Sequence, residues 1–361
     1  MKVLLVGEYS GFFNNLKAGL LSLGVDCQLA SGEDGFKKIG GMDIQLFGRK
    51  NGSSIFSKIY NYIIYPFVHK KSLYGFDVVL MIGPSPFYKT INKCMFKKIK
   101  KHCKKIYVSV CGGTFSLYKS WENKTLSYYV FDDNPYSTGA FNYHLKKNFR
   151  RYATENYVYD NADGIIPIMY EYAVGVKERK NCRHTIPLPF DSSTVCYKPN
   201  IVLGKIRIAH GIIREHSKGT KVILKALDII KRKYPNEVEI VIPQKMPLKE
   251  YIQFLSTINV LVDQCKEHCY GLNALYAMAS GRIVLGGASD NSLKEFGLTK
   301  CPVFHIEYNV ESIVKQIENV ISLKSEFERI GKESRTFVET FHNHTSIAAQ
   351  YLSLWEKDLK Q

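Results

Sequence analysis

Two facing Rossmann-like doubly wound α/β domains with an interdomain cleft are the fold that this sequence predicts. The chain has 361 residues, 45% of them hydrophobic, which is enough for two cores of ordinary size. Short apolar runs alternate with helical patterns in two series, as in parallel βαβ units. A join rich in proline, serine and threonine, HTIPLPFDSSTVCYKPN at His184 to Asn200, separates the two series.

The first series predicts an N-terminal domain over residues 1–190. Its apolar runs predict buried parallel strands, and its segments with helical periodicity predict the helices between them. The strands are expected at 2–7, 25–31, 76–83, 106–113 and 164–169, and the helices at 14–24 and 89–105.

The second series predicts a C-terminal domain over residues 191–344. Strands are expected at 205–211, 238–244, 259–264 and 282–287, and helices at 220–235, 248–257, 272–280 and 310–321. A last segment, 345–361, contains a helix that can pack back on the N-terminal domain. Two such sheets bind ligands at the carboxyl ends of their strands, so we expect the site in the cleft between the domains.

The positive charge is concentrated in the N-terminal half. The formal net charge is +17, and residues 1–190 hold 27 Lys and Arg against 14 Asp and Glu. Residues 51–150 alone hold 16 against 4. This field favours an anionic partner, such as a membrane surface, a lipid-linked phosphate or a nucleic acid. No nucleic-acid-binding motif accompanies the charge, so nucleic acid is not an expected partner.

The densest basic segment is KTINKCMFKKIKKHCKK, from Lys89 to Lys105. Its apolar residues fall along one helical stripe between lysines. Two readings remain open: a basic amphipathic helix that lies on a membrane, and a surface helix that packs on the sheet with a solvated lysine face.

The sequence also predicts a protein of the cytoplasm, located peripherally at the inner face of the cell membrane. The start lacks a secretory apolar segment, and the longest apolar stretch, IYNYIIYPFV, is too short to span a bilayer. Nine scattered cysteines are typical of reduced thiols. Cys265, His268 and Cys269 lack a second ligand pair, so no metal and no cofactor are expected.

Two loops that follow strands are candidate sites for a phosphorylated donor. In GEYSGFFNNL the turn that carries Gly11 opens a helix, whose amide groups favour an anion or a hydroxyl-rich ligand. In HGIIREHSKGTKVILKAL, Arg214 and Lys218 come between a strand that ends at His210 and the next helix. Two cations at a helix start suit a diphosphate, although an ordinary solvated loop would look the same.

These segments carry a resemblance. The Lys-Gly-Thr helix start, the strand that ends in Val-Asp-Gln, the Tyr-Gly-Leu turn and the Ala-Met-Ala-Ser-Gly segment resemble the nucleotide-sugar domain of GT-B glycosyltransferases, in particular the retaining family 4 group that builds bacterial surface glycans. The motifs occur in the family's order and cover about half of the C-terminal domain. The N-terminal half is similar only in layout and in its glycine-containing first loop.

The resemblance implies a role for each matched position. His210, which ends the strand before the phosphate loop, would contact the donor, and Arg214 and Lys218 would neutralise the leaving diphosphate as the catalytic groups. The backbone amides of Tyr270, Gly271 and Leu272 would hold the donor. The nucleotide sugar would be a substrate, and retaining transfer of this kind needs no protein nucleophile.

The chain departs from the family at two positions. The family usually carries two glutamates seven positions apart, and here they are replaced by His268 and Tyr276. A tyrosine offers one hydroxyl where a carboxylate offers two acceptor oxygens for the ribose. The Tyr276 hydroxyl, or a neighbour such as Glu267 or Asn273, would then have to replace the ribose contact, or donor binding would be lost.

The acceptor is expected at the N-terminal domain. In CGGTFSLYKSW, Gly113 and Thr114 follow a strand and could hold sugar hydroxyls or a lipid phosphate. The aromatic segment YYVFDDNPYSTGAFNYH that follows could stack on sugar rings or simply pack. The sequence thus predicts transfer of a sugar, with retention, to a glycan or lipid-linked acceptor in surface polysaccharide or glycoconjugate synthesis. The alternative is a GT-B-fold pseudoenzyme or glycan-binding protein that has lost donor binding.

Overall fold

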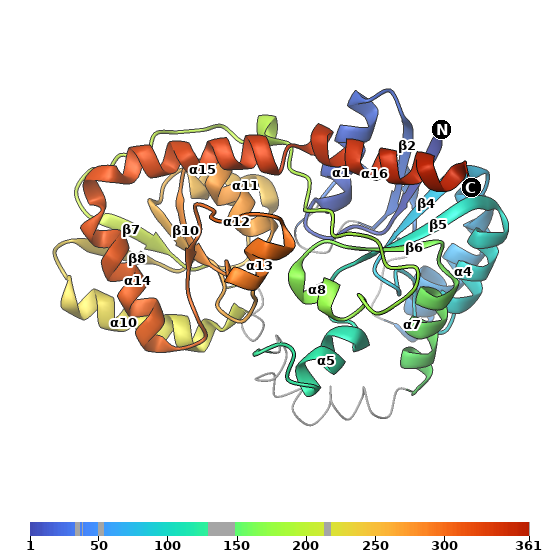
Figure 1. The fold of residues 1–361 in the computed structure, drawn as a ribbon, viewed down its shortest axis with the longest axis horizontal. Coiled ribbons are helices and arrows are strands. Elements are labelled where there is room, and N and C mark those ends of the chain that lie inside the picture. Colours follow the sequence, from blue (N-terminus) through green and yellow to red (C-terminus); the bar gives the residue numbers. More distant parts are fainter. Residues whose placement is uncertain (33–36, 38, 50–53, 129–148, 213–217, 361) are drawn as a thin grey trace. The chain divides into compact units, whose positions relative to one another are not determined.

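The chain forms two compact units, each built around its own parallel sheet (Figure 1). The computed structural model describes the chain except residues 33–36, 38, 50–53, 129–148, 213–217 and 361. Apart from those gaps, unit 1 comprises residues 1–120, 149–189 and 344–360, and unit 2 comprises residues 121–128 and 190–343. Residues 121–128 therefore group with unit 2, whereas the sequence boundaries place them in the N-terminal domain.

Unit 1 has a six-stranded parallel sheet with the order β3-β2-β1-β4-β5-β6. The strands are β1 (Lys2–Val6), β2 (Asp26–Ser31), β3 (Ile44–Gln45), β4 (Phe76–Ile82), β5 (Cys103–Val110) and β6 (Gly164–Pro167). The register pairs Leu5 with Leu29 on one side and with Leu80 on the other. The sheet is buried on both faces, which explains why its strands read as continuous apolar runs. This strand order is that of a Rossmann-like domain, as predicted.

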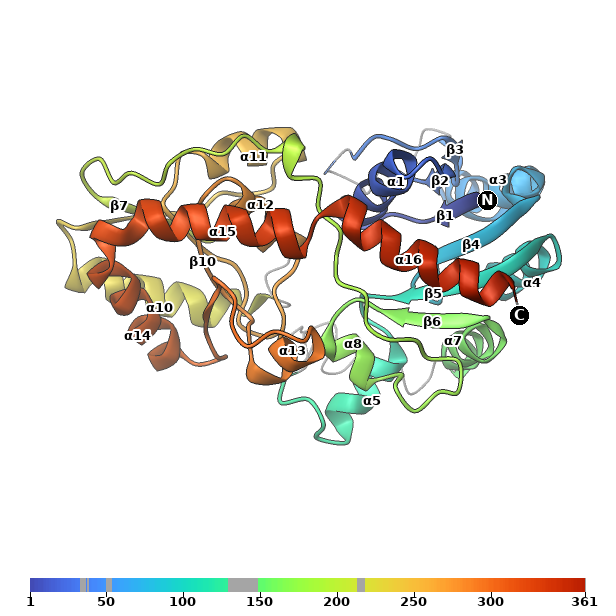
Figure 2. The same ribbon diagram turned by 45° about the horizontal axis from the view of Figure 1, so that its top comes forward.

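The helices of unit 1 cover both faces of this sheet. They are α1 (Phe12–Ser22), α2 (Ile55–Ile59), η2 (Tyr60–Ile64), α3 (Tyr65–Val68), η3 (His69–Leu73), α4 (Asn92–Lys101), α5 (Phe115–Glu122), α7 (Phe149–Asn161), α8 (Tyr170–Val174) and α16 (His344–Leu359). The C-terminal helix α16 lies beside α1 in both ribbon views (Figure 2). The helices touch at Gly19, where an added Cβ would meet the carbonyl oxygen of His344 at 2.2 Å.

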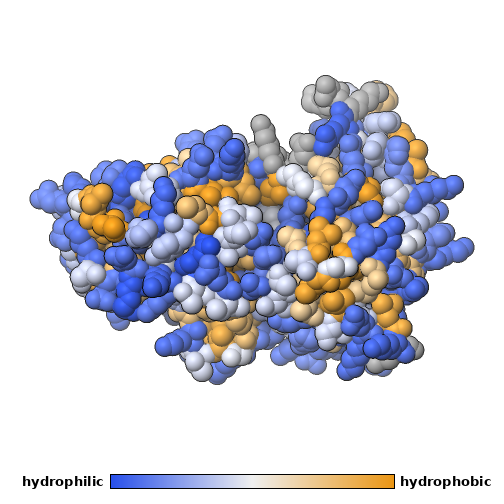
Figure 3. Space-filling model, turned by 90° about the horizontal axis from the view of Figure 1, so that it is seen from above, coloured by the Kyte–Doolittle hydropathy of each residue, from blue (hydrophilic) through white to orange (hydrophobic). Residues whose placement is uncertain are grey.

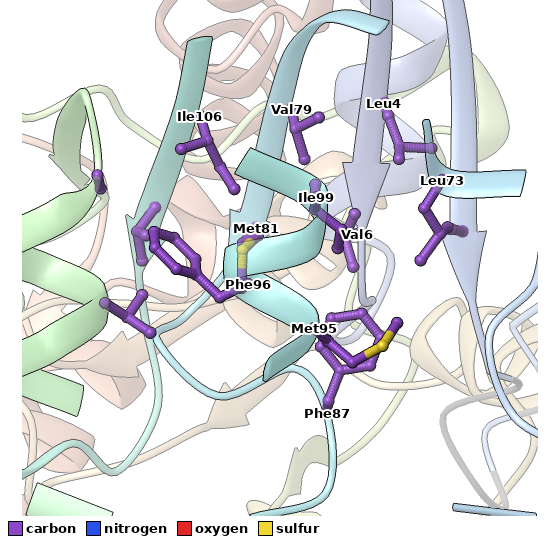
Figure 4. Close-up of a cluster of buried hydrophobic side chains, with 14 of the residues drawn as sticks. Leu4, Val6, Leu73, Val79, Met81, Phe87, Met95, Phe96, Ile99 and Ile106 are labelled. Atoms are coloured by element: carbon purple, nitrogen blue, oxygen red, sulfur yellow. The ribbon is translucent and has the colours of Figure 1, made fainter. Parts of the chain in front are cut away.

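Helix α4 is the basic helix of the sequence, and its apolar stripe faces the protein. Met95, Phe96 and Ile99 are fully buried and point toward side chains of β1 and β4, including Val6 and Met81 (Figure 4). The side chains of Lys93, Lys97 and Lys100 on α4 are exposed. A helix whose apolar stripe is buried in the core cannot insert that stripe into a bilayer. Of the two interpretations, α4 is therefore the surface helix that packs on the sheet.

Unit 2 repeats the design with a five-stranded parallel sheet in the order β11-β10-β9-β7-β8. Its strands are β7 (Ile206–Ala209), β8 (Val238–Val241), β9 (Val260–Val262), β10 (Ile283–Gly286) and β11 (Phe304–His305). Its helices are α10 (Thr220–Lys233), α11 (Leu248–Leu255), α12 (Leu272–Ala279), α13 (Asp290–Glu295), α14 (Val310–Ser322) and α15 (Phe327–Phe341), with 3₁₀ turns η4 (Ser192–Thr194) and η5 (Lys324–Glu326). The fold class predicted from the sequence is therefore confirmed for each unit.

The face drawn in Figure 3 is largely hydrophilic, with several hydrophobic areas among the charged side chains. Within the described part of the chain, no helix combines the length and the apolar character that a membrane span requires.

Candidate functional site

The candidate site of unit 2 lies where the strand order reverses. Strand β7 pairs with β8 on one side and with β9 on the other, so the connections from β7 and β9 leave the sheet in opposite directions. Open parallel sheets bind ligands outside the carboxyl ends of the strands at this switch point. Here the two strand ends are followed by His210 and Asp263.

Asp263 connects the side chains that gather at this edge of the sheet. Its side chain is 1% exposed, and Oδ1 accepts hydrogen bonds from Lys218 Nζ and Asn273 Nδ2, both at 2.6 Å. The other oxygen, Oδ2, is buried and has no partner among the described residues. Asp263 therefore brings two predicted site residues, from the start of α10 and the start of α12, to one carboxylate.

Lys218 is positioned by the backbone around it. Its carbonyl oxygen accepts a hydrogen bond from the Cys265 amide at 3.1 Å. The next residue, Gly219, has φ 75°, and a Cβ there would lie 2.4 Å from Cys265 Sγ. Both facts require glycine at this turn. The ammonium of Lys218 has three donors, of which the described structure uses one on Asp263, so it can still bind a phosphate.

His210 links the end of β9 to the start of α10, next to this loop. It is fully buried, with Nδ1 2.8 Å from the carbonyl oxygen of Val262 and Nε2 2.9 Å from Thr220 Oγ1. Burial, reinforced by the nearby Lys218 ammonium, lowers the pKa of His210 to about 4. The neutral ring joins β9 to the first residue of α10. Both ring nitrogens of His210 are used inside the protein, and a contact between His210 and the donor stays a prediction.

The turn before α12 is held by side chains that face the protein. Gln264 donates one hydrogen bond to the carbonyl oxygen of Cys269 at 3.1 Å and another to Glu267. The Tyr270 hydroxyl lies 3.0 Å from Nε2 of His342, and its ring is buried. The side chain of Tyr270 is thus committed to packing, and only its backbone could serve a ligand.

Helix α12 begins at Leu272, directly after Gly271 in an extended conformation. Within the described part of the chain, no acceptor is recorded for the amide groups of Leu272 and Asn273. The first turn contains no acidic residue. Unpaired amides at the positive end of a helix, close to Lys218, form an arrangement that suits an anionic group.

The two positions that replace the family's glutamates lie in different environments. The His268 ring has Nδ1 3.3 Å from Ser289 Oγ and its centroid 6.0 Å from that of Tyr128. Tyr276 is 7% exposed, and its ring meets Phe190 edge to face at 4.9 Å. Tyr276 is therefore at least partly a packing residue, whatever its hydroxyl contacts in a complex.

The structure adds residues that the sequence analysis did not select. Lys266 is 1% exposed, and its ammonium lies 4.7 Å from the centre of the Tyr308 ring. That ring also contacts the turn at Gly219, since a Cβ there would approach it to 3.1 Å. Asp263 could have been selected from the sequence, because a carboxylate directly after a buried strand marks the ligand-binding edge. Lys266 and Tyr308 carry no such signal.

Arg214 lies outside the described residues, as do residues 129–144 of the aromatic segment, all of it except Tyr128. Their roles remain predictions. Among the residues that the structure covers, no cluster of three or more His, Cys, Asp or Glu side chains has the arrangement of a metal site.

The first loop of unit 1 does not present the open helix start that the sequence predicts. The buried carboxylate of Glu8 accepts hydrogen bonds from the Gly11 amide through Oε1 and from the Asn14 amide through Oε2, each at 2.9 Å. It also accepts from Asn14 Nδ2 at 2.9 Å. The start of α1 therefore already holds an anion that belongs to the protein. In this structure the Gly11 amide is used by Glu8, and the binding of the donor by Gly11 stays a prediction.

The start of α5, after Gly113 and Thr114, is filled in the same way. Glu155 of α7 accepts hydrogen bonds from the Phe115 amide at 2.9 Å and from the amide and hydroxyl of Ser116 at 3.1 and 3.0 Å. Thr114 is buried, and its Oγ1 accepts from the Leu117 amide at 3.2 Å. The hydroxyl of Thr114 thus caps a helix, and a lipid phosphate would meet the negative charge of Glu155 here.

Comparisons with known proteins establish the fold. No family model and no curated protein matches the sequence. Solved structures do match: sucrose-phosphate synthase from Thermosynechococcus elongatus has a TM-score of 0.65 at 13% identity, with 99% of each chain covered. HepE from Anabaena in complex with UDP-glucose has a TM-score of 0.63 at 11% identity, with 99% of this chain and 100% of that chain covered. UDP-GlcNAc 2-epimerase from Neisseria meningitidis has 0.56 at 13%, with the same coverage. The chain has the GT-B fold.

Proposed function

We propose that this protein is a glycosyltransferase that moves a sugar, with retention, from a nucleotide-sugar donor to a glycan or lipid-linked acceptor in the synthesis of a surface polysaccharide or glycoconjugate. The observation that carries the proposal is that two kinds of anion-binding donor occur together at the switch point of unit 2. They are the ammonium of Lys218 and the amides at the start of α12 that have no acceptor in the described structure. A protein of the same fold, HepE, has been crystallised with UDP-glucose.

The arrangement can stabilise a departing diphosphate. When the bond from the sugar's anomeric carbon to the phosphate oxygen breaks, negative charge grows on the diphosphate. Lys218 and the amides of Leu272 and Asn273 are fixed donors that can meet this charge without reorganising. Asp263 holds the Lys218 ammonium and the Asn273 side chain in place. The anomeric carbon then bonds to an acceptor hydroxyl, whose proton is released, and no cofactor takes part.

Calorimetric titration with UDP and UDP-sugars tests the proposal. Lys218→Gln removes the charge but keeps a polar side chain, and we expect donor affinity to fall about tenfold or more. Lys300→Gln, at an exposed lysine of the same unit, is the matched control and should bind as the wild type does. Release of the nucleoside diphosphate in the presence of a lipid-linked acceptor would then establish transfer. Equal affinity in all three proteins would contradict the assignment of Lys218.

A second candidate is a GT-B-fold protein that binds glycans but no longer transfers sugar. Two observations favour it: Lys218 is already paired with a buried carboxylate, and Tyr276 packs on Phe190 where the family has a ribose-binding glutamate. This candidate predicts that the folded wild type binds no nucleotide or sugar nucleotide but does bind an oligosaccharide. A titration that shows the reverse removes it.

We also propose that the protein works peripherally at the cytoplasmic face of the cell membrane, where anionic lipid attracts it. The support is the charge of residues 51–150, 16 Lys and Arg against 4 Asp and Glu. Each cation near an anionic surface contributes on the order of 1 kcal/mol, and salt weakens the attraction. Nucleic acid is not part of this proposal.

A further inference from the structure

One short helical segment of unit 1 exposes an unusual amount of apolar surface. Residues 55–68 form the continuous run of α2, η2 and α3. Of the sixteen large hydrophobic side chains exposed in the described chain, eight belong to this run. We call them the apolar face: Ile55, Phe56, Ile59, Tyr60, Tyr62, Ile64, Phe67 and Val68. The most exposed are Phe56 at 77%, Ile55 at 68% and Val68 at 61%.

The polarity of this segment is inverted relative to an ordinary surface helix. Ser57 is buried, whereas its apolar neighbours Ile55, Phe56 and Ile59 are exposed. An amphipathic helix on a soluble domain normally turns its apolar stripe to the core and its polar residues to water. Exposed apolar side chains that are concentrated in one segment, and not scattered singly, indicate a site of interaction with another protein or a membrane.

The segment is anchored to unit 1, so the exposure does not come from a loose end. Ser54 caps α2 by accepting a hydrogen bond from the Ser57 amide at 3.2 Å. The carbonyl oxygen of Asn61 accepts from the Gly48 amide at 3.0 Å. Pro66 and Leu73 are buried, and Ile63 packs against the core. The π-helical turn η2 precedes Pro66, whose missing amide prevents regular α-helical bonding.

The surroundings of the apolar face are exclusively basic in sequence. Residues 44–76 contain no Asp or Glu but carry Arg49, Lys50, Lys58, Lys70 and Lys71. The ammonium of Lys70 lies 4.5 Å from the centre of the Phe67 ring, and that of Lys98, from α4, lies 5.4 Å from it. Cations beside exposed apolar and tyrosine side chains match a surface that has anionic headgroups above an acyl interior.

We propose that the apolar face docks on an anionic lipid bilayer, with its apolar side chains in the headgroup and acyl boundary and the flanking lysines at the headgroups. The run lies along the interface and does not span the bilayer, because it is only 14 residues long. The inference rests on the proposed membrane location and is independent of sugar transfer. It places the membrane contact on the α2–α3 run and not on α4, whose apolar stripe is buried.

Vesicle flotation with the full chain tests the inference. Wild type should bind vesicles of phosphatidylcholine and phosphatidylglycerol, and binding should fall with salt and with removal of phosphatidylglycerol. The variant Ile55→Ser, Phe56→Ser, Val68→Ser should bind at least about tenfold more weakly at equal salt, because it loses apolar groups but no charge. The matched control is Ile201→Ser, Leu203→Ser, which removes two exposed apolar side chains of unit 2 that are 58% and 90% exposed; it should bind as wild type does.

A tryptophan reporter gives a second measurement. In Phe56→Trp the added indole should shift to shorter emission wavelengths on anionic vesicles and be quenched by brominated lipid, whereas in Leu203→Trp it should not respond. Unchanged vesicle binding by the triple serine variant, or no response of Trp at position 56, overturns the inference. Sedimentation decides the rival occupant: a wild-type dimer that the triple variant dissolves, without vesicle binding, would make the face a contact between two copies.

Nucleotide titration of the same variants separates this inference from the proposed function. The triple serine variant should bind UDP as wild type does, since the apolar face and the Lys218 site belong to different units. Loss of vesicle binding with intact UDP binding supports the inference alone. Failure of UDP binding in every protein, with normal vesicle binding, would refute the donor site and leave the docking face standing.

Discussion

The helix starts of the two units have the same position in the fold but opposite electrostatics. In unit 1 the starts of α1 and α5 are filled by carboxylates of the chain itself, Glu8 and Glu155. In unit 2 the start of α12 has amides without a recorded acceptor in the described structure, and Lys218 stands before α10. A helix start binds an external anion only where the protein has not supplied one. This difference supports the proposal that the diphosphate binds to unit 2, because the starts of α1 and α5 already hold carboxylates of the chain.

The largest expected effect is on the Lys218–Asp263 pair. Lys218→Ala leaves a carboxylate that is 1% exposed without its cation, and we expect the free energy of unfolding to fall by about 3 kcal/mol. Urea unfolding measures the change. The double variant Lys218→Ala, Asp263→Asn should recover part of the loss, because the buried charge has gone as well. A wild-type midpoint for Lys218→Ala would show that the pair contributes nothing to stability.

The second prediction concerns pH and the buried histidine beneath that pair. The folded pKa of His210, about 4, lies below the ordinary value of 6.5, so the unfolded chain binds the proton first as the pH falls. The contribution of neutral His210 to the free energy of unfolding is fully present above about pH 6.5. It is lost as the pH falls toward 4, and it amounts to on the order of 3 kcal/mol in all. Unfolding of the wild type and His210→Gln at pH 7 and 4.5 tests this. The two proteins should differ in stability more at pH 7 than at pH 4.5, and a constant difference would contradict the burial argument.

A third prediction converts one kind of helix start into the other. Glu8→Gln removes the charge at the start of α1, and loss of charge-assisted hydrogen bonds should lower stability by about 2 kcal/mol. Phosphate or sulfate should then raise the melting temperature of Glu8→Gln more than that of the wild type. The control is Asp290→Asn, at an exposed acid in the first turn of α13. If phosphate stabilises wild type and Glu8→Gln equally, the carboxylate is not what excludes an anion.

The smallest expected effect belongs to Tyr276. Tyr276→Phe keeps the ring and its edge-to-face contact with Phe190, so at most one net hydrogen bond is lost. We expect UDP affinity and stability each to change by no more than about 1 kcal/mol. Calorimetry and urea unfolding measure the two changes. A large loss of affinity with unchanged stability would instead make the hydroxyl a donor contact.

The sequence determined the two Rossmann-like units because their strands are buried on both faces. A parallel strand covered by helices on each side must be apolar throughout, and runs such as VLLV and VVLMI show this without any knowledge of their partners. The sequence also located the loop of Lys218 and the start of α12, because residues that follow such strands lie at the ligand-binding edge.

Which helix starts are open was decided by tertiary structure alone. Glu155 lies about forty residues after the helix start that it caps, and Asp263 meets Lys218 across 45 positions of sequence. Periodicity describes neighbours along the chain, so it gave α1 and α12 the same glycine-turn signature. Likewise, the stripe of α4 and the apolar residues of α2–α3 look alike as sequence. Packing against the sheet buries the stripe of α4 and leaves the apolar residues of α2–α3 exposed. The hydrophobicity of a side chain does not determine which side of its helix faces the core.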